Sequence, residues 1–190
     1  MSSGPAGPVL LRRIILTGFM GAGKSTVGRM LAGRLGWPFL DIDSVIEAEQ
    51  DCTVAQIFAD HGEPHFRGLE AEAVARVLAS DHEYPQAVVA LGGGAIETAA
   101  VRGLLLTPGA IAVFLSAPLD ELLSRCGRGA ETPIRPLLVA AEPPEDRLAR
   151  RLPHYREAHL TVDTGGIPPA AVVDRILEWL EAYDPPHLER

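Results

Sequence analysis

The sequence predicts an α/β fold in which a parallel sheet is covered by helices on both faces. From residue 13 onwards, candidate buried strands alternate with helical segments in the order β-α-β-α-β-α-β-α, and this alternation is typical of parallel sheets. A glycine-rich segment, 18–25, separates the first strand from the first helix. The composition, with 47% hydrophobic but only 5% aromatic residues in a chain of 190, indicates one domain with a mainly aliphatic core.

The first strand, 13–17, reads Arg-Ile-Ile-Leu-Thr, an apolar β-branched run suited to a buried position. The first helix, 26–35, carries Val27, Leu31 and Leu35 at helical spacing. Between them, 18–25 reads Gly-Phe-Met-Gly-Ala-Gly-Lys-Ser and fits the pattern G-x-x-x-x-G-K-[ST]. A strand, this loop and a helix in succession predict a phosphate-binding loop.

The residue types of this loop fit the binding of a nucleoside triphosphate. Glycines let backbone N–H groups converge on an anion, and the helix that follows directs the positive end of its dipole at the same phosphates. Lys24 can reach the β- and γ-phosphates, and the Ser25 hydroxyl can ligate Mg²⁺. We therefore expect ATP as co-substrate and Mg²⁺ as cofactor, with ATP held by Gly21, Ala22, Gly23, Lys24, Ser25 and Thr26.

A short strand at 37–40 leads into Asp41-Ile42-Asp43. In an extended segment the two carboxylates lie on one side, and at the carboxyl end of a strand they face the ligand crevice. One of them can then hold Mg²⁺ or its water, and the other can take a proton from a hydroxyl. The alternative is that Asp43 only caps the helix 44–49.

The later segments complete the alternation. The expected elements are a short helix at 53–59, a break at 61–64, a helix at 66–78, a strand at 86–91 ending in Gly92–Gly94, a helix at 96–105, a strand at 110–115, a helix from Pro118, a helix at 145–157 interrupted or kinked by Pro153, a strand at 160–163 and a helix at 168–183. Arg67 lies in the first turn of its helix, where the dipole disfavours a cation. It therefore either serves a ligand or is a solvated surface residue.

Residues 125–136 hold three arginines, two glycines and two prolines without a helix or strand period. We expect a lid that is mobile when empty and closes on phosphates, the alternative being a solvated surface loop. The expected organisation is one domain, 11–183, with this lid inside it, a flexible N-terminal tail, 1–10, and a C-terminal tail, 184–190.

The net charge of −8 disfavours nucleic acid as a partner. No apolar run of membrane-spanning length and no signal-peptide core occurs, so we expect a cytoplasmic protein. Cys52 and Cys126 have no metal or redox spacing and are expected to be free thiols, and the six histidines show no zinc pattern. Nothing in the sequence requires more than a monomer.

Five motifs then occur in a fixed order, namely 18–28, Asp41-Ile42-Asp43, Ile57-Phe58 with Gly62-Glu63 and Phe66-Arg67-x-x-Glu70, Gly92-Gly93-Gly94, and Arg135-Pro136-Leu137-Leu138. With them the chain resembles the shikimate kinase family from about Leu11 to Trp179. The resemblance implies a three-layer P-loop fold of the nucleoside-monophosphate-kinase type, with a five-stranded parallel sheet and a mobile lid. It also implies phosphorylation of the 3-hydroxyl of shikimate by MgATP, in chorismate and aromatic amino-acid biosynthesis.

The resemblance further implies the roles of single residues. Asp43 matches the substrate-binding acid that accepts the hydroxyl proton, Arg67 and Arg156 match the arginines that hold the shikimate carboxylate, and Gly93 matches a backbone contact to shikimate. On the ATP side, Ser25 matches the Mg²⁺ ligand with Asp41 acting through water, and Lys24, Arg128 and Arg135 match catalytic groups, Arg135 also binding ATP. The segment Thr164–Pro168 has no arginine, unlike some family members, so the adenine contacts stay unassigned.

Two other functions remain as alternatives. A different small-molecule kinase of this fold, such as a gluconate kinase, usually has Asp-Gly-Asp and a His-Pro shortly afterwards, whereas here Asp41-Ile42-Asp43 precedes Ser44-Val45-Ile46. The second alternative is a nucleotide-binding module that has lost its activity. The filled catalytic positions count against that module.

Overall fold

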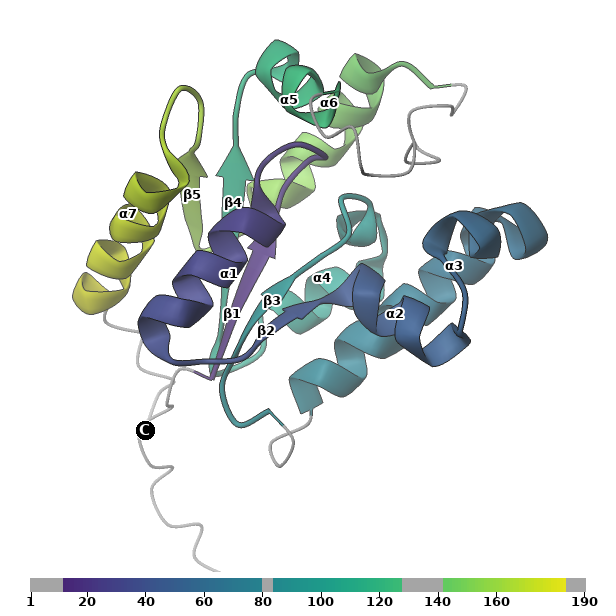
Figure 1. The fold of residues 1–190 in the computed structure, drawn as a ribbon, viewed down its shortest axis with the longest axis horizontal. Helices are drawn as coiled ribbons and strands as arrows, with labels where there is room; N and C mark the ends of the chain where they lie inside the picture. The colour runs from purple at the N-terminus through teal and green to yellow at the C-terminus, as the bar shows by residue number, and fades with distance from the viewer. Residues whose placement is uncertain (1–11, 80–83, 128–141, 184–190) are drawn as a thin grey trace, which may run out of the picture.

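Five parallel strands form one sheet in the order β2-β3-β1-β4-β5 (Figure 1). The structure is a computed structural model that describes residues 12–79, 84–127 and 142–183. The strands are β1 (Arg13–Thr17), β2 (Phe39–Asp41), β3 (Ala87–Ala90), β4 (Ala110–Ser116) and β5 (Leu160–Asp163). The predicted α/β fold with a five-stranded parallel sheet is confirmed.

Helices cover both faces of this sheet. They are α1 (Lys24–Leu35), α2 (Ile42–Gln50), α3 (Val54–Ala79), the 3₁₀ helix η1 (Ala95–Glu97), α4 (Ala99–Leu105), α5 (Leu119–Gly127), α6 (Pro144–Tyr155) and α7 (Pro169–Ala182). Every residue of β1 and β3 is buried, and because side chains alternate between the two faces of a strand, both faces must be covered. In Figure 1, α1 and α7 pack side by side in front of the sheet.

The carboxyl ends of the strands meet along one edge of the sheet, which is where parallel α/β folds bind ligands. The phosphate loop follows β1, Asp41 ends β2, and Gly92–Gly94 follow β3. Leu91 donates its N–H to the carbonyl of Leu16, which fixes the start of the triple glycine beside the start of the phosphate loop. The fold thus brings together three motifs that are far apart in the sequence.

The predicted break near residue 62 is present inside α3. Gly62 has φ 78° and ψ 170°, a non-helical conformation that separates two helical parts of the continuous element Val54–Ala79. Glycine adopts this positive φ without the steric cost that a Cβ imposes. Residues 63–79 therefore run in a new direction, and this second part carries Arg67 and Glu70.

Two expectations about the second strand and helix were wrong. Asp41 and Asp43 do not share one extended segment, because β2 has only three residues and α2 begins at Ile42. Asp43 lies in the first turn of α2, where a carboxylate is favoured by the helix dipole, and it is not the N-cap.

The expected helix at 96–105 is not one continuous helix. The 3₁₀ turn of η1 is separated from α4 at Thr98.

Two boundaries on the carboxyl-terminal side also differ from expectation. Pro153 does not interrupt α6, which continues for two residues beyond it to Tyr155. The proline has no N–H and so removes one helical hydrogen bond, to the carbonyl four residues earlier. The expected lid, 125–136, begins too early, since residues up to Gly127 belong to α5. The rest of that segment, 128–136, and both expected tails, 1–10 and 184–190, lie outside the described residues.

No helix in the described ranges is both long enough and apolar enough to cross a membrane. Both cysteines are free and partly buried, as expected from their spacing.

Two glycines of α1 offer a matched test of packing. A Cβ at Gly28 would collide with the ring of Phe39 and lie 3.2 Å from Leu16 Cδ1, whereas a Cβ at Gly33 would meet nothing within 4 Å. We expect Gly28→Ala to lower the melting temperature by about 2–6 °C through overpacking. Gly33→Ala should raise it by about 2–4 °C, because alanine favours the helix. Thermal unfolding of both variants checks this, and a stabilised Gly28→Ala would contradict the described packing of β2 on α1.

Candidate active site

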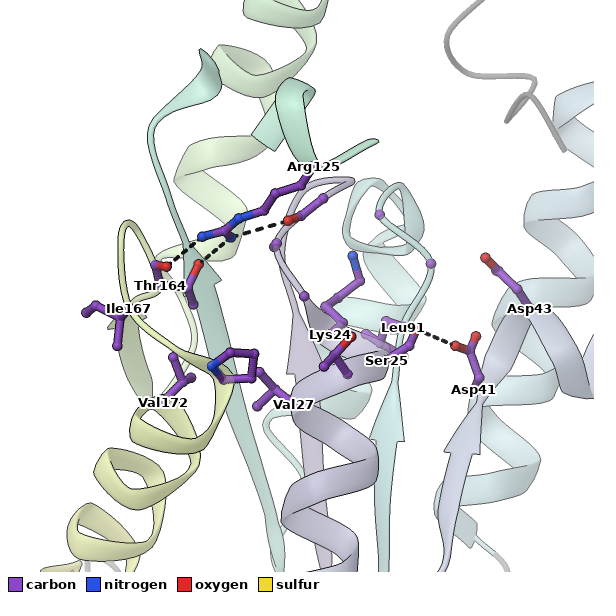
Figure 2. Close-up of a pocket in the computed structure, with 17 residues that line it drawn as sticks. Lys24, Ser25, Val27, Asp41, Asp43, Leu91, Arg125, Thr164, Ile167 and Val172 are labelled. Carbon is purple, nitrogen blue, oxygen red and sulfur yellow. Dashed lines mark hydrogen bonds between the residues drawn. The ribbon is translucent and has the colours of Figure 1, made fainter. Parts of the chain in front are cut away.

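A cavity of about 410 Å³ opens at the carboxyl edge of the sheet (Figure 2). Its lining comes from the phosphate loop and α1, from the two aspartates, from the segment that follows β3, from α5, and from the β5–α7 connection with the start of α7. The lining residues are Gly21, Ala22, Gly23, Lys24, Ser25, Thr26, Val27, Asp41, Asp43, Leu91, Gly92, Gly93, Arg125, Thr164, Ile167, Pro169 and Val172. The cavity therefore contains all the residues predicted to bind ATP that the structure describes.

The phosphate loop has the geometry of an anion site. Gly23 is the N-cap of α1 with φ 89°, a conformation that favours glycine, and α1 begins at Lys24. The Lys24 side chain is buried, and its Nζ donates to the carbonyl oxygens of Gly18 at 2.8 Å and Phe19 at 3.1 Å. The ammonium group is thus held over the loop, beside the N–H groups of a helix N-terminus.

Ser25 and Asp41 meet at the floor of the cavity. The Ser25 hydroxyl donates to Asp41 Oδ2 at 2.8 Å, which joins α1 to the end of β2 (Figure 2). A hydroxyl and a carboxylate are hard oxygen donors, which Mg²⁺ prefers, and they lie next to the phosphate loop. These two residues fit a magnesium ion, which they would help to hold beside the phosphate loop. Within the described ranges, no cluster of three or more His, Cys, Asp or Glu side chains is placed to hold a metal.

Asp43 reaches the same cavity from α2 and lies beside Glu70 of α3. A Cβ built on Gly92 would collide with Glu70 Oε1 and lie 2.9 Å from Asp43 Oδ1. Both carboxylates therefore lie close to the backbone of Gly92, and only glycine leaves room for them. This close approach gives a packing reason for a glycine immediately after β3.

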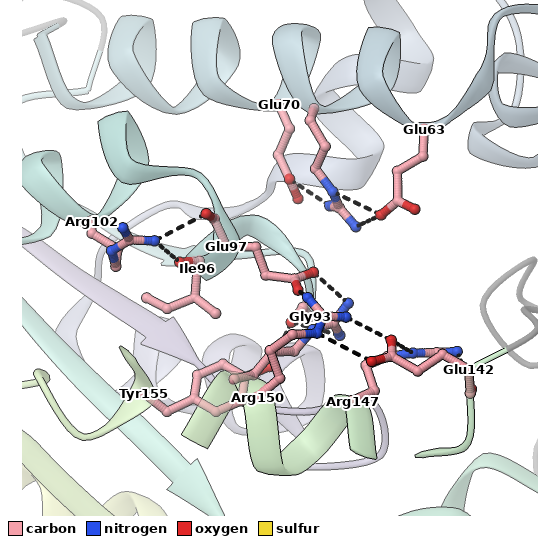
Figure 3. Close-up of polar contacts among 12 residues, drawn as sticks. Glu63, Glu70, Gly93, Ile96, Glu97, Arg102, Glu142, Arg147, Arg150 and Tyr155 are labelled. Atoms are coloured by element: carbon pink, nitrogen blue, oxygen red, sulfur yellow. Dashed lines mark hydrogen bonds and ion pairs between the residues drawn. The ribbon is translucent and has the colours of Figure 1, made fainter. Parts of the chain in front are cut away.

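Arg67 lies behind the triple glycine. Its guanidinium lies against Gly94, and it pairs with Glu70 at 2.6 Å and Glu63 at 2.8 Å (Figure 3). Burial lowers the pKa of Arg67, but the two glutamates outweigh that effect and the net shift is upward. Burial raises the pKa of the fully buried Glu70, against the opposing effect of Arg67. Arg67 is thus a charged group held in a fixed orientation. This excludes the alternative that Arg67 is a solvated surface residue.

Arg151 and Tyr155 of α6 were missed by the sequence reading. Arg151 Nη1 and the Tyr155 hydroxyl both donate to the carbonyl oxygen of Gly93, at 3.2 Å and 2.5 Å. Burial raises the pKa of Tyr155 to about 12, so its hydroxyl keeps the proton it donates. Both side chains are almost completely buried. Their i, i+4 spacing, which places two side chains on one helix face, was the available signal.

The predicted residue Arg156 lies elsewhere. It is the C-cap of α6 and is exposed, whereas Arg151 of the same helix reaches Gly93. The structure therefore brings Arg67, Arg151, Gly93 and Asp43 together at one end of the site and leaves Arg156 on the surface. Arg128 and Arg135 lie outside the described residues, so their predicted place over ATP is untested.

Arg125 joins the phosphate loop to the loop after β5, where the sequence lacks an arginine. It donates to Thr164 Oγ1 at 3.0 Å, to the Thr164 carbonyl at 2.6 Å and to the Gly21 carbonyl at 3.4 Å (Figure 2). Glu121, one helical turn earlier, accepts from Arg125 at 2.6 Å and from the N–H of Gly166 at 3.0 Å. An arginine from α5 thus supplies this part of the cavity.

Comparison with known proteins agrees with this geometry. The family model described as shikimate kinase matches residues 20–181. A shikimate kinase from Moorella thermoacetica is 44% identical over 172 residues, covering 90% of this chain and 95% of that protein. One from Rhodopseudomonas palustris is 42% identical over 175 residues, covering 90% of this chain and 82% of that protein.

A solved structure gives the same result in three dimensions. Shikimate kinase from Acinetobacter baumannii in complex with shikimate superposes with a TM-score of 0.81 and 37% sequence identity. The match covers 92% of this chain and 95% of that one.

Proposed function

The chain belongs to the shikimate kinase family, and from this premise we propose that it transfers the γ-phosphate of MgATP to the 3-hydroxyl of shikimate, a step of chorismate biosynthesis. The observation that carries the proposal is a single cavity that joins the phosphate loop to Asp43, with Arg67 and Arg151 behind the glycines that follow β3. One end suits a triphosphate. The other suits a small hydroxylated acid, because paired arginines recognise a carboxylate.

On the ATP side, the loop N–H groups and Lys24 bind and orient the phosphates, and Ser25, with Asp41 acting through water, would hold Mg²⁺. When bound there, Mg²⁺ would supply positive charge against the phosphates. The apolar walls formed by Val27, Ile167 and Val172, below Arg125, suit the flat faces of adenine. The resemblance assigns Arg128 and Arg135 to the ATP phosphates, and this stays a prediction.

On the acceptor side, Asp43 takes the proton of the attacking hydroxyl and orients it towards the γ-phosphate. Phosphoryl transfer needs mainly alignment and charge neutralisation, so a positioned carboxylate is enough as the base. Arg67 and Arg151 hold the carboxylate of shikimate, and the backbone at Gly93 contacts the substrate. Arg151 thus takes the role that the sequence reading gave to Arg156.

Arg151 and Arg156 give a matched pair for this assignment. Arg151→Ala should raise the KM for shikimate by about 10–100-fold, because a charge-assisted contact to the acceptor carboxylate is lost, and should leave the KM for ATP within about threefold. Steady-state kinetics with each substrate varied would measure both. Arg156→Ala should behave like wild type. A large effect at Arg156 and none at Arg151 would return the role to Arg156.

The activity itself is tested by ADP release from MgATP with shikimate, gluconate, AMP or no acceptor. Release that depends on shikimate supports the proposal. Release with gluconate favours the other small-molecule kinase and removes the carboxylate assignment. Binding of ATP without release on any acceptor favours the inactive nucleotide-binding module.

We also propose that the protein works as a cytoplasmic monomer on small-molecule substrates. We propose no nucleic-acid partner, since the net charge of −8 disfavours contacts to phosphates of a nucleic acid. Sedimentation with and without both substrates would test the monomer.

A further inference from the structure

Glu97 is placed against Arg151 but has no part in the scheme above. It is the last residue of η1, the turn that directly follows the triple glycine, and its side chain is 21% exposed. Its Oε2 accepts from Arg151 Nη2 at 2.8 Å, and its other oxygen pairs with Arg150 (Figure 3). One carboxylate thus contacts two consecutive arginines of α6.

In the part of the chain that the structure describes, Glu97 is the carboxylate that forms an ion pair with the buried Arg151 guanidinium, at 2.8 Å. Burial and the neighbouring Arg67 guanidinium lower the pKa of Arg151, against the opposing effects of Tyr155 and Glu63. Arg151 also donates a hydrogen bond to the backbone carbonyl of Gly93, which carries no charge. Among the described residues, Arg151 Nε is buried and has no hydrogen-bond partner. A donor of a buried guanidinium is therefore left for a ligand.

We propose that Glu97 is a positioning residue that holds the Arg151 guanidinium so that its remaining donors meet the carboxylate of the acceptor. The proposal rests on the proposed function, in which Arg151 binds that carboxylate. Without Glu97, the guanidinium is free to turn towards Glu63, whose charge already attracts it. A group that must first be re-oriented binds its ligand more weakly.

Glu97 belongs to a small network of ion pairs along α6. Arg150 is also paired with Glu142, at 2.6 Å, and Glu142 lies 3.6 Å from Arg147 (Figure 3). Glu97 is therefore shared between Arg150 and Arg151, and Arg150 has a second carboxylate partner in Glu142.

The test compares Glu97→Gln with wild type on two acceptors, shikimate and its methyl ester. Glutamine keeps the shape of the side chain and removes its charge. We expect the KM for shikimate to rise about tenfold, with kcat and the KM for ATP within about threefold of wild type. The preference of wild type for the acid over the ester should shrink in the variant, because Glu97 acts through the carboxylate.

Glu157→Gln is the matched control, since Glu157 is exposed and pairs with His154 instead of an arginine of the site. It should leave both acceptors unaffected. Glu97→Asp, which keeps the charge, should be closer to wild type than Glu97→Gln and serves also if the glutamine variant folds poorly. An unchanged KM for shikimate in Glu97→Gln, or an equal loss on the acid and the ester, would overturn the positioning role. If wild type does not phosphorylate shikimate in the same assay, the proposed function fails instead.

Discussion

Lys24→Ala should reduce phosphoryl transfer by about a thousandfold or more, the largest effect that we expect from a single substitution. The Lys24 ammonium is buried and already held at the carbonyls of Gly18 and Phe19. We propose that the β- and γ-phosphates of ATP bind next to it. Charge that develops on those phosphates would lose its nearest fixed cation. Single-turnover transfer at saturating ATP measures this loss apart from weaker ATP binding.

Two further variants make the Lys24 result specific. Lys24→Met retains most of the apolar stem and should be nearly as inactive as Lys24→Ala, because the charge is what acts. Arg34→Ala removes an exposed cation of the same helix, paired with Asp174 at 3.0 Å, and should keep full activity, since exposed pairs contribute little. A rate for Lys24→Ala within about tenfold of wild type would refute the assignment of Lys24.

The phosphate loop could be predicted because all its determinants are contiguous. The glycines, Lys24 and Ser25 lie within one strand–loop–helix unit, so that spacing along the chain is also spacing in the site. The parallel sheet could be predicted for a related reason, since fully buried strands have a local signature of continuous apolar residues.

Asp43 lines the cavity as predicted, but it does so from a helix and not from the predicted strand. Alternation along a strand was expected to point both aspartates to one side, whereas Asp41 reaches the cavity from the end of β2 and Asp43 from the first turn of α2. Where a short strand ends and a helix begins depends on tertiary packing, here the burial of Ile42 and Ile46 against the core. Local pattern alone does not contain that boundary.

Helix phase separates Arg151 from Arg156, the arginine that the family resemblance implied. With about 100° per residue, the two positions are about 140° apart around the axis of α6, so only one can face Gly93. The sequence-based prediction placed a break at Pro153. Residues beyond such a break have no fixed orientation around the helix axis, so this prediction could not exclude Arg156. Since α6 continues to Tyr155, the face that presents Tyr155 also presents Arg151.

Asp43→Asn should lower kcat by about 10²–10⁴-fold, the range of a lost general base, and leave the affinity for ATP nearly unchanged. Asparagine has nearly the same shape and fits the narrow space beside Gly92 and Glu70, so the site should keep its structure. An amide, however, does not accept the hydroxyl proton. Steady-state kcat, with ATP binding measured by calorimetry, tests both halves of this expectation.

Asp41→Asn separates this role from that of the metal, because the two aspartates line the same cavity but Asp41 is bonded to Ser25. Loss of the Asp41 charge should raise the Mg²⁺ concentration needed for half-maximal rate, and added Mg²⁺ should recover much of kcat. The same addition should recover nothing in Asp43→Asn. If Mg²⁺ restored Asp43→Asn, Asp43 would act on the ion. If kcat of Asp43→Asn equalled that of wild type, Asp43 would only orient shikimate, and another group would accept the hydroxyl proton.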